Sequence, residues 1–326
     1  IPQWNVAGDV YYASGAKSSM NTYSERTNFF NANIYSEYTY QLKDHTLKAM
    51  VGYQSESNYW RKVGAQKEDL ISESVTDITV ATGKEYLAGG RNHWATAGFF
   101  GRINYDYAGR YLAEVNLRYD GTSRFASDQR WNLFPSFSAG WNIAREAFME
   151  PYTDIINNLK LRGSWGILGN QNIDLYSYYA LVTTGKDYSF DNSNLDAGVA
   201  QTALTNRDLK WESTSIGDFG IDITAFNGFN ITFDWYKKRT YDILREAQSN
   251  SLLGLKSPYI NAGEMVNKGI EISLAYNGYI REGIFKGLSY NAGVFFDRTR
   301  NELTKYGADY VDSSKGLIYK EGLPYG

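Results

Sequence analysis

The chain has 326 residues, including 28 Tyr, 16 Phe and 8 Trp, with 33 Lys and Arg against 36 Asp and Glu. The lack of cysteine excludes disulfides, cysteine-ligated zinc, iron–sulfur clusters and a cysteine nucleophile. His45 and His93 are the only histidines, which excludes a three-histidine metal centre, and the formal charge of -3 gives no general attraction to nucleic acid. The mean hydropathy of -0.47 implies that apolar residues are interspersed with polar ones, and no run approaches the ~18 apolar residues of a membrane-spanning helix.

The predicted elements are almost all β-strands, because apolar residues recur at every second position along the chain. The alternating runs, taken in chain order, lie at or near residues 4–13, 28–41, 46–60, 94–107, 115–120, 136–143, 159–167, 219–225, 229–236, 268–280 and 288–296. They predict roughly 11 strands. No comparably long window shows the 3.6-residue apolar stripe of a helix, so the predicted fold class is all-β.

Short and long connections alternate strictly between these runs. The short ones are predicted at residues 43–45, 108–109, 227–228 and 281–286, with a longer variant at 145–158, and the long ones at 14–25, 61–92, 124–132, 170–208 and 246–267. Asn227-Gly228 favours a type I′ turn within a hairpin. The alternation indicates an up-and-down antiparallel meander, with tight turns on one rim and large loops on the other. Outer-membrane β-barrels have this organisation.

The composition of the two strand faces favours a membrane barrel over a soluble sandwich or jelly roll, which remains the alternative. Several runs extend for ~15 residues, against ~5–6 in a typical globular strand, and the polar face is rich in Asn, Ser, Thr, Gly and Asp, which suits a hydrated lumen. Aromatic residues near the strand ends are predicted to form interfacial girdles: Tyr105, Tyr107, Tyr111, Tyr119, Trp235 and Tyr236. Because an open sheet edge is costly in lipid, we expect residues 1–326 to be part of a longer barrel.

Four ordered segments resemble the SusC/RagA-type TonB-dependent outer-membrane transporters. They are residues 118–141 (RYDGTSRFASDQRWNLFPSFSAGW), 159–171 (LKLRGSWGILGNQ), 206–212 (NRDLKWE) and 261–271 (NAGEMVNKGIE). Arg207 stands where the family's third motif usually has proline, and Gly163 and Trp165 depart from common choices in the second. The resemblance implies that residues 1–326 form about 11 strands of a barrel with about 22. The family's plug domain and closing strands are expected outside this segment.

The resemblance also implies a function. A transporter of this type actively imports an oligomeric nutrient, a glycan or a peptide, across the outer membrane, together with a SusD-like surface lipoprotein that acts as a lid and the TonB complex, which acts through parts absent here. No step breaks a covalent bond, so we expect no enzyme activity, no catalytic residues, no cofactor and no metal site. The alternatives are a plug-free porin, an outer-membrane assembly component, or a soluble carbohydrate-binding protein.

Two groups of residues are candidates for binding sites. Tyrosines in the long segment 170–208 would suit a ligand mouth by stacking on a sugar or packing on a peptide, although they could equally pack the loop itself: Tyr176, Tyr178, Tyr179 and Tyr188. The basic cluster Lys237, Lys238 and Arg239 closes a strand on the outer-leaflet side. It is a candidate contact for lipopolysaccharide phosphates, and the alternative interpretation is a solvated strand end.

Two further features near the long connections have mainly structural interpretations. Arg124 and Arg130 flank a loop with Asp120 and Asp128. The four residues could form a ligand clamp, but we expect their charges to pair with one another at the rim. Trp211 precedes a strand and is predicted to be a girdle anchor rather than a binding platform.

Overall fold

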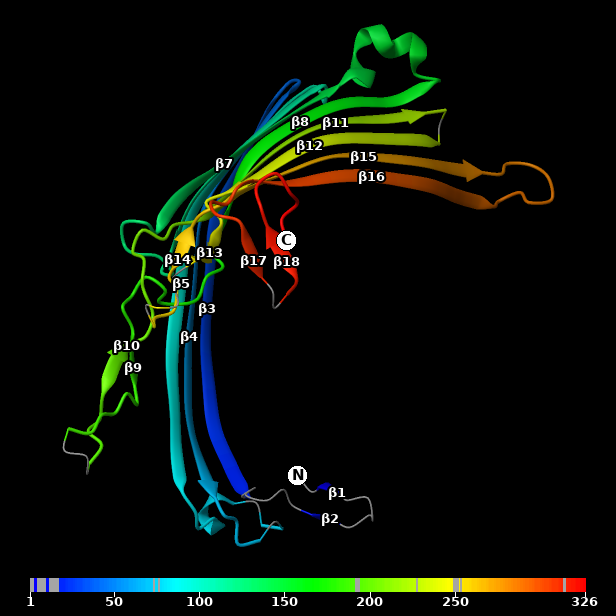
Figure 1. Ribbon diagram of the computed structural model, residues 1–326. Helices are drawn as coiled ribbons and strands as arrows, with labels where there is room; N and C mark the ends of the chain where they lie inside the picture. The colour runs from blue at the N-terminus through cyan, green and yellow to red at the C-terminus, as the bar shows by residue number, and fades with distance from the viewer. Residues whose placement is uncertain are drawn as a thin grey trace. The chain divides into compact units, whose positions relative to one another are not determined.

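The computed structural model describes residues 3–4, 10–11, 18–72, 74–75, 77–190, 194–226, 228–248, 252, 254–312 and 315–326 (Figure 1). The chain forms two compact units. One comprises Ile1–Asn31 with Glu56–Trp94, and the other comprises Ala32–Ser55 with Ala95–Gly326.

A ten-stranded sheet dominates the described chain, and each of its strands is hydrogen-bonded to the next strand of the sheet along the sequence. The resolved pairings are antiparallel. The strands are β3 (Ser19–Leu42), β4 (His45–Glu68), β5 (Glu85–Tyr107), β6 (Tyr111–Thr122), β7 (Trp131–Asn142), β8 (Ile156–Asn170), β11 (Glu212–Ala225), β12 (Phe229–Tyr241), β15 (Glu264–Tyr279) and β16 (Ser289–Lys305). The all-β antiparallel meander is confirmed.

The eleventh predicted strand, near residues 4–13, is wrong. The described residues there form only β1 (Gln3–Trp4) and β2 (Val10–Tyr11), which pair with each other and not with the large sheet. The other residues of this run lie outside the described part of the chain.

The strands β3, β4 and β5 are longer than predicted, with 24, 24 and 23 residues. A strand needs only about 9–11 residues to cross a bilayer. The predicted loop at residues 61–92 is therefore too long, because the strands leave only residues 69–84 between them, with a short 3-10 helix, η1 (Ile78–Val80). Alternation misses these extensions because exposed strand ends do not need an apolar face.

The predicted hairpin of β11 and β12 is confirmed, but its turn differs. Ala225 pairs with Phe229, so three residues connect the strands rather than the two of a type I′ turn. Phe226 adopts a left-handed conformation with φ of 51°, and Asn227 lies outside the described residues.

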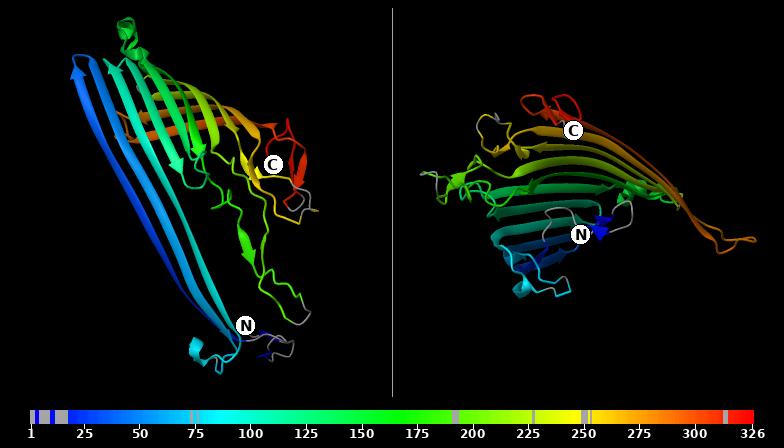
Figure 2. Two further views of the ribbon diagram at one scale, coloured as in Figure 1. Left: turned by 90° about the vertical axis from the view of Figure 1, so that its left-hand side faces the viewer. Right: turned by 60° about the horizontal axis from the view of Figure 1, so that its bottom comes forward.

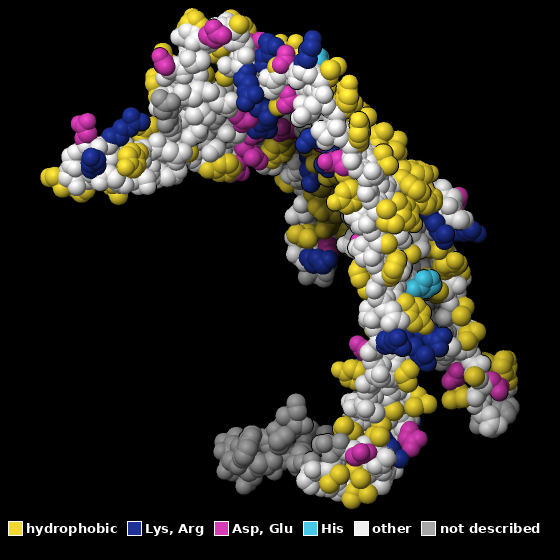
Figure 3. Space-filling view, turned by 180° about the vertical axis from the view of Figure 1, so that it is seen from behind, with side chains coloured by type: hydrophobic (Ala, Val, Ile, Leu, Met, Phe, Trp, Pro, Cys, Tyr) yellow, Lys and Arg dark blue, Asp and Glu magenta, His cyan; other side chains and the backbone are white. Residues whose placement is uncertain are grey.

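The register of the central strands confirms the two-faced pattern. Ile223, Ile231 and Leu274 lie opposite one another on β11, β12 and β15, and the neighbouring row consists of Asp222, Thr232 and Ser273. We call the side of the sheet that carries the first row the apolar face and the opposite side the polar face. In Figure 3, hydrophobic side chains gather over the strands, and Lys and Arg side chains form separate patches.

Aromatic side chains stack on the apolar face near both ends of the strands. Tyr107, Tyr111 and Trp141 form one series close to the short turns, with centroid distances of 6.2 and 6.4 Å. Tyr119 and Trp131 stack at 5.0 Å close to the long connection between β6 and β7. Two aromatic bands separated by apolar residues are typical of the girdles of membrane barrels.

Smaller elements occupy the connections (Figure 2). Three two-stranded sheets follow β8, β12 and β16: β9 (Val182–Thr184) with β10 (Val199–Gln201), β13 (Leu244–Glu246) with β14 (Tyr259–Asn261), and β17 (Tyr310–Asp312) with β18 (Leu317–Tyr319). The β7–β8 connection holds two 3-10 helices, η2 (Ile143–Arg145) and η3 (Ala147–Tyr152). Within the described chain, no helix is both long and apolar enough to cross a membrane.

Candidate functional site on the polar face and the long connections

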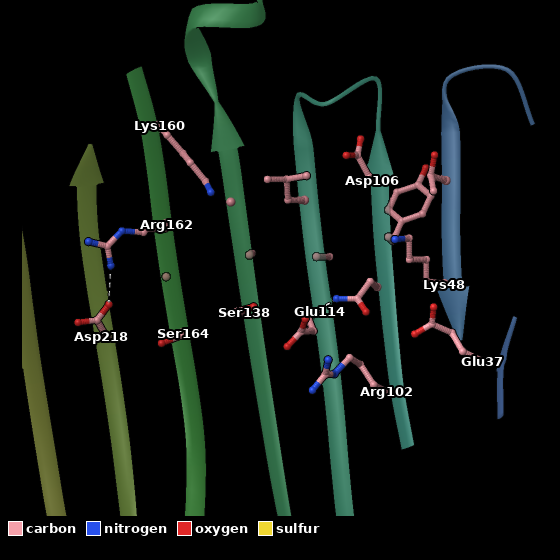
Figure 4. A pocket seen from close by; sticks show the side chains of 18 residues that line it. Glu37, Lys48, Arg102, Asp106, Glu114, Ser138, Lys160, Arg162, Ser164 and Asp218 are labelled. Carbon is pink, nitrogen blue, oxygen red and sulfur yellow. Dashed lines mark hydrogen bonds and ion pairs between the residues drawn. The ribbon is translucent and has the colours of Figure 1, made fainter. Parts of the chain in front are cut away.

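The polar face lines a cavity of about 620 Å³ in the larger unit. Figure 4 shows charged and polar side chains from several neighbouring strands around it. Both signs of charge are present in its lining: Glu37, Lys48, Arg102, Asp106, Glu114, Lys160, Arg162 and Asp218. Such a surface can bind water and polar solutes and has little affinity for lipid.

Arg162 is the centre of an ion-pair cluster on this face. Its Nη1 lies 3.3 Å from Asp218 Oδ1, its Nε 3.1 Å from Asp222 Oδ2 and its Nη2 2.5 Å from Asp234 Oδ1. Gly220 lies directly between Arg162 and Asp234 in the register. A Cβ there would stand 2.4 Å from Arg162 Cζ and 2.6 Å from Asp234 Oδ1, so the missing side chain is what lets the ion pair form across a strand.

A second contact on the polar face is built in the same way. The Tyr236 hydroxyl lies 2.7 Å from Thr299 Oγ1, and Gly269 is the residue between them in the register. A Cβ on Gly269 would stand 2.5 Å from the Tyr236 ring. The predicted role of Tyr236 in a lipid-facing girdle is therefore wrong, because its side chain lies on the face opposite to that of Trp235.

The long connections share a buried core next to the ends of β7 and β11. It consists of Phe125, Ala126, Phe134, Ile173, Tyr178, Leu209 and Trp211. Five of these seven residues belong to the first and third of the motifs noted above. The loops are therefore packed against one another by shared apolar contacts.

Trp211 is the largest side chain of this core and is only 6% exposed. Its ring lies 5.8 Å from Phe125 and 5.3 Å from Phe134, in edge-to-face geometry. Its Nε1 donates to the Arg130 carbonyl at 2.7 Å. The predicted girdle role is wrong, because a ring enclosed by two loops cannot lie at a lipid interface.

The predicted pairing among the rim charges is also wrong for both arginines. Asp120 is instead paired with Arg118, whose Nε and Nη2 lie 3.0 and 2.9 Å from the two carboxylate oxygens of Asp120. Arg124 instead donates from Nη1 to the Ile173 carbonyl, and Arg130 Nε donates to the Phe125 carbonyl at 3.2 Å. Loop carbonyls removed from water need donors, and these two guanidinium groups supply them. Burial lowers the pKa of Arg124, and the charge of Asp174 partly opposes this shift.

The structure brings three of the four candidate tyrosines together. Tyr178 is 8% exposed and belongs to the buried core, and burial is the main cause that raises its pKa. Tyr179 is exposed and lies 4.3 Å from Tyr178 between ring centroids, and Tyr176 lies 6.4 Å from Tyr179. Tyr188 is apart from them, packs edge-on against Phe190 at 5.0 Å and is 65% exposed. Tyr178 is thus a packing residue, and Tyr179 and Tyr188 present accessible rings.

A second cavity of about 400 Å³ adjoins Tyr178 and Tyr179 and is also lined by Arg130, Thr205 and Arg207. Arg130 was named from the sequence only as part of a possible ligand clamp, and Arg207 was not named as a binding residue. The sequence did mark Arg207 as unusual, because it stands where the family motif usually has proline. The cavity combines aromatic surface with hydrogen-bond donors.

The candidate lipopolysaccharide cluster does not lie on one face. Successive residues of a strand point to opposite sides, so Lys237 and Arg239 share the apolar face with Trp235, and Lys238 shares the polar face with Tyr236. Arg239 already forms a bidentate ion pair with Glu264, with its Nε and Nη2 at 2.8 and 2.6 Å from the carboxylate oxygens. The predicted three-residue patch is therefore divided. In the chain described here, no group of three or more His, Asp or Glu side chains is arranged to hold a metal ion.

Comparison with known proteins identifies the class. The model of the TonB dependent receptor-like β-barrel family matches residues 3–322, and the chain belongs to this family. Its relatives place it in the SusC/RagA type. TonB-dependent receptor P39 of Formosa agariphila is 31% identical over 100% of this chain and 30% of its own length. TonB-dependent receptor SusC of Bacteroides thetaiotaomicron is 31% identical over 84% of this chain and 27% of its own length.

A solved structure agrees with these relatives. The RagAB peptide transporter superposes with a TM-score of 0.84 at 25% identity, over 94% of this chain and 34% of that chain. The chain thus spans about three tenths of the length of the curated relatives that it matches. The outer-membrane β-barrel interpretation is confirmed over the soluble alternative. The relatives are receptors and transporters, which supports a role other than catalysis.

Proposed function

We propose that this chain forms part of the wall of an outer-membrane importer that takes up an oligomeric nutrient and is energised through TonB. The observation that carries the proposal is the register of β11, β12 and β15, which places Ile223, Ile231 and Leu274 on one face and Asp222, Thr232 and Ser273 on the other. A wall between lipid and a hydrated lumen needs this division.

The segment as a whole is proposed to be the central part of a larger barrel. Ten strands of the sheet are described, against about 22 strands in a barrel of this type. A plug domain and the closing strands would be supplied by other parts of the protein. A SusD-like lipoprotein is the proposed partner above the long connections.

The polar side chains have distinct roles in this proposal. The Arg162 cluster carries more negative than positive charge, so it would offer acceptors and ordered water to whatever fills the lumen. The cavity near Tyr179 and Arg207 would contact substrate at the mouth, since a tyrosine ring stacks on a sugar or packs on a peptide side chain and a guanidinium donates to carbonyl or hydroxyl oxygens.

Uptake by cells that express the full-length protein and its lipoprotein partner tests the proposal. Fluorescent oligosaccharides and oligopeptides would be supplied to cells with and without TonB. We expect saturable uptake of one class that is lost without TonB. Uptake that persists unchanged without TonB would contradict the proposal and support a passive porin.

Two variants test whether the cavity near Tyr179 and Arg207 contributes to this uptake. Tyr179→Ala and Arg207→Ala are each expected to raise the half-saturating substrate concentration roughly fivefold to tenfold, which corresponds to a loss of about 1–1.4 kcal/mol of binding free energy. Tyr152→Ala is the matched control, because Tyr152 is an exposed tyrosine in η3, in the β7–β8 connection. An equal effect of all three variants would exclude a specific role for the mouth.

A further inference from the structure

A row of three cations crosses the apolar face of the sheet. Lys237 of β12 lies opposite Lys268 of β15, which in turn lies opposite Arg300 of β16. All three residues are exposed. Like charges placed directly opposite each other destabilise a sheet, so the row is not explained by the stability of the strands.

The next row contributes a fourth cation. Arg298 lies opposite Ile270, which lies opposite Trp235. Within the described chain, none of Lys237, Lys268, Arg298 and Arg300 forms an ion pair, whereas the neighbouring Arg239 is held by Glu264. We call these four unpaired residues the cation row. In the described chain no carboxylate lies within ion-pair distance of these four side chains, and Glu302 is the nearest acidic residue on the same face of β16, two positions from Arg300.

The cation row marks the end of the apolar surface. Below it, towards the short turns, each row on β12, β15 and β16 is apolar: Phe233, Ile272 and Phe296, followed by Ile231, Leu274 and Val294. Trp235, 46% exposed, stands at the boundary, where an amphipathic ring is expected at a membrane interface. The other side of the row leads into the long connection at residues 242–263.

The same row of paired residues is cationic on β12, β15 and β16 and apolar on β8, β7 and β6, as expected for strands that are tilted in the membrane. Continued through the register to β8, β7 and β6, it passes through Gly217 to Trp165, Phe137 and Val115. Strands of a barrel are tilted by about 35–45°, so a row perpendicular to them crosses the bilayer obliquely. The cations thus begin where this row leaves the hydrocarbon.

We propose that the cation row binds the phosphate groups of a phosphorylated outer-leaflet lipid, with its acyl chains along Phe233, Ile272 and Phe296. Neighbouring strands are about 4.8 Å apart, so Lys237, Lys268 and Arg300 span roughly 10 Å, which suits a phosphorylated headgroup. The outer-leaflet assignment rests on the proposed orientation, in which the long connections face outwards. Lys238 takes no part, because it lies on the polar face.

Native mass spectrometry of the full-length protein in detergent tests the site, with diphosphoryl lipid A as probe. Dephosphorylated lipid A, phosphatidylglycerol and inorganic phosphate form the comparison arms. The test variant combines Lys237→Gln, Lys268→Gln and Arg300→Gln. The control variant combines Lys43→Gln, Arg281→Gln and Lys286→Gln, which removes the same charge from exposed positions in the short turns. Heat-modifiable gel migration establishes that both variants are folded.

We expect the test variant to bind diphosphoryl lipid A at least tenfold more weakly than the unmodified protein and the control variant to bind it equally well. Unchanged binding by the test variant, equal loss in the control, or equal binding of the dephosphorylated lipid would overturn the proposal. Competition by inorganic phosphate with no lipid binding would show an ion site and also contradict it. Uptake that persists while lipid binding fails would leave the proposed transport function intact.

Discussion

Arg162 of β8 contacts Asp234 of β12 across the whole width of β11, with 2.5 Å between Nη2 and Oδ1. The contact is possible because Gly220, the β11 residue between them, has no side chain. The polar face thus contains an ion pair that joins strands two positions apart. Such a contact adds to the ladder hydrogen bonds in holding three strands in one register.

Gly220→Ala is expected to break this contact. The new Cβ would overlap the guanidinium and leave Asp234 without its cation. We expect the free energy of unfolding to fall by roughly 1–3 kcal/mol, with a value near the lower end because Arg162 is partly exposed to solvent. The temperature at which the folded band of the full-length protein is lost on a gel measures the effect.

Gly163→Ala is the matched control for this change. A Cβ on Gly163 would have its nearest neighbour at 3.8 Å, an ordinary contact. Equal stability of the Gly220→Ala and Gly163→Ala proteins would show that the ion pair adds nothing to the barrel.

The Tyr236–Thr299 contact gives a graded prediction. Tyr236→Phe removes one hydrogen bond and is expected to cost about 1 kcal/mol. Gly269→Ala is expected to cost more, because its Cβ would stand 2.5 Å from the Tyr236 ring. The unfolding temperatures of the two variants measure the order, with Gly217→Ala as a control whose Cβ would lie 3.9 Å from Trp165. A larger loss for Tyr236→Phe than for Gly269→Ala would refute the role assigned to the glycine.

The strands could be predicted from the sequence because alternation is a local property. The cross-strand contacts could not be predicted, since they depend on register. Arg162 and Asp234 are 72 positions apart, and only the pairing of both strands with β11 places them side by side. The same holds for Lys237, Lys268 and Arg300, which no sequence window contains together. Lys237 and Lys238 illustrate the converse, because neighbours in sequence lie on opposite faces.

Trp211 is expected to hold the long connections together. Trp211→Ala removes a nearly buried ring, which typically costs about 3–5 kcal/mol, and this loss should be confined to the connections. Hydrogen exchange should therefore accelerate at residues 171–180 and 206–210, with the amides of β8 and β11 unchanged. Trp165→Ala, which alters an exposed ring on the apolar face, should leave these connections protected. Acceleration throughout the sheet would contradict a local role.

The stability of the β7–β8 connection is expected to depend on pH through the ionisation of Glu146. The Tyr111 hydroxyl, the Trp141 Nε1 donor at 2.9 Å and the Arg110 guanidinium lower its pKa from the ordinary value of 4.5. A carboxyl group with a lowered folded-state pKa stabilises the fold above the unfolded pKa, and this contribution is lost as the pH falls through the folded value. Below pH 4.5, the amides of η2 and η3 should therefore exchange faster.

The pH dependence has a simple control. Glu146→Gln cannot ionise, so hydrogen exchange in η2 and η3, corrected for intrinsic rates, should no longer change over this pH range. A Glu146→Gln protein that keeps the full pH dependence would assign the effect to another group.

The ligand mouth stays a prediction, because exposure alone does not show binding. Tyr179 and Tyr188 are exposed and Tyr178 is buried, and Trp211, which was predicted to be a girdle anchor, is buried as well. Aromatic residues in a loop have the same sequence signal whether they pack inwards or outwards. Only the contacts of one connection with another decide between these roles.

The central claim is that the sheet separates lipid from a hydrated lumen, and spin-label accessibility tests it most directly. The 326 residues contain no cysteine, so single labels can be introduced at Phe233, Thr232, Ile272 and Ser273 in the full-length protein, after replacement of any cysteine elsewhere. In membranes, positions 233 and 272 should be accessible to oxygen, and positions 232 and 273 to a water-soluble nickel chelate. Equal accessibility at neighbouring positions, or the reverse pattern, would contradict the account.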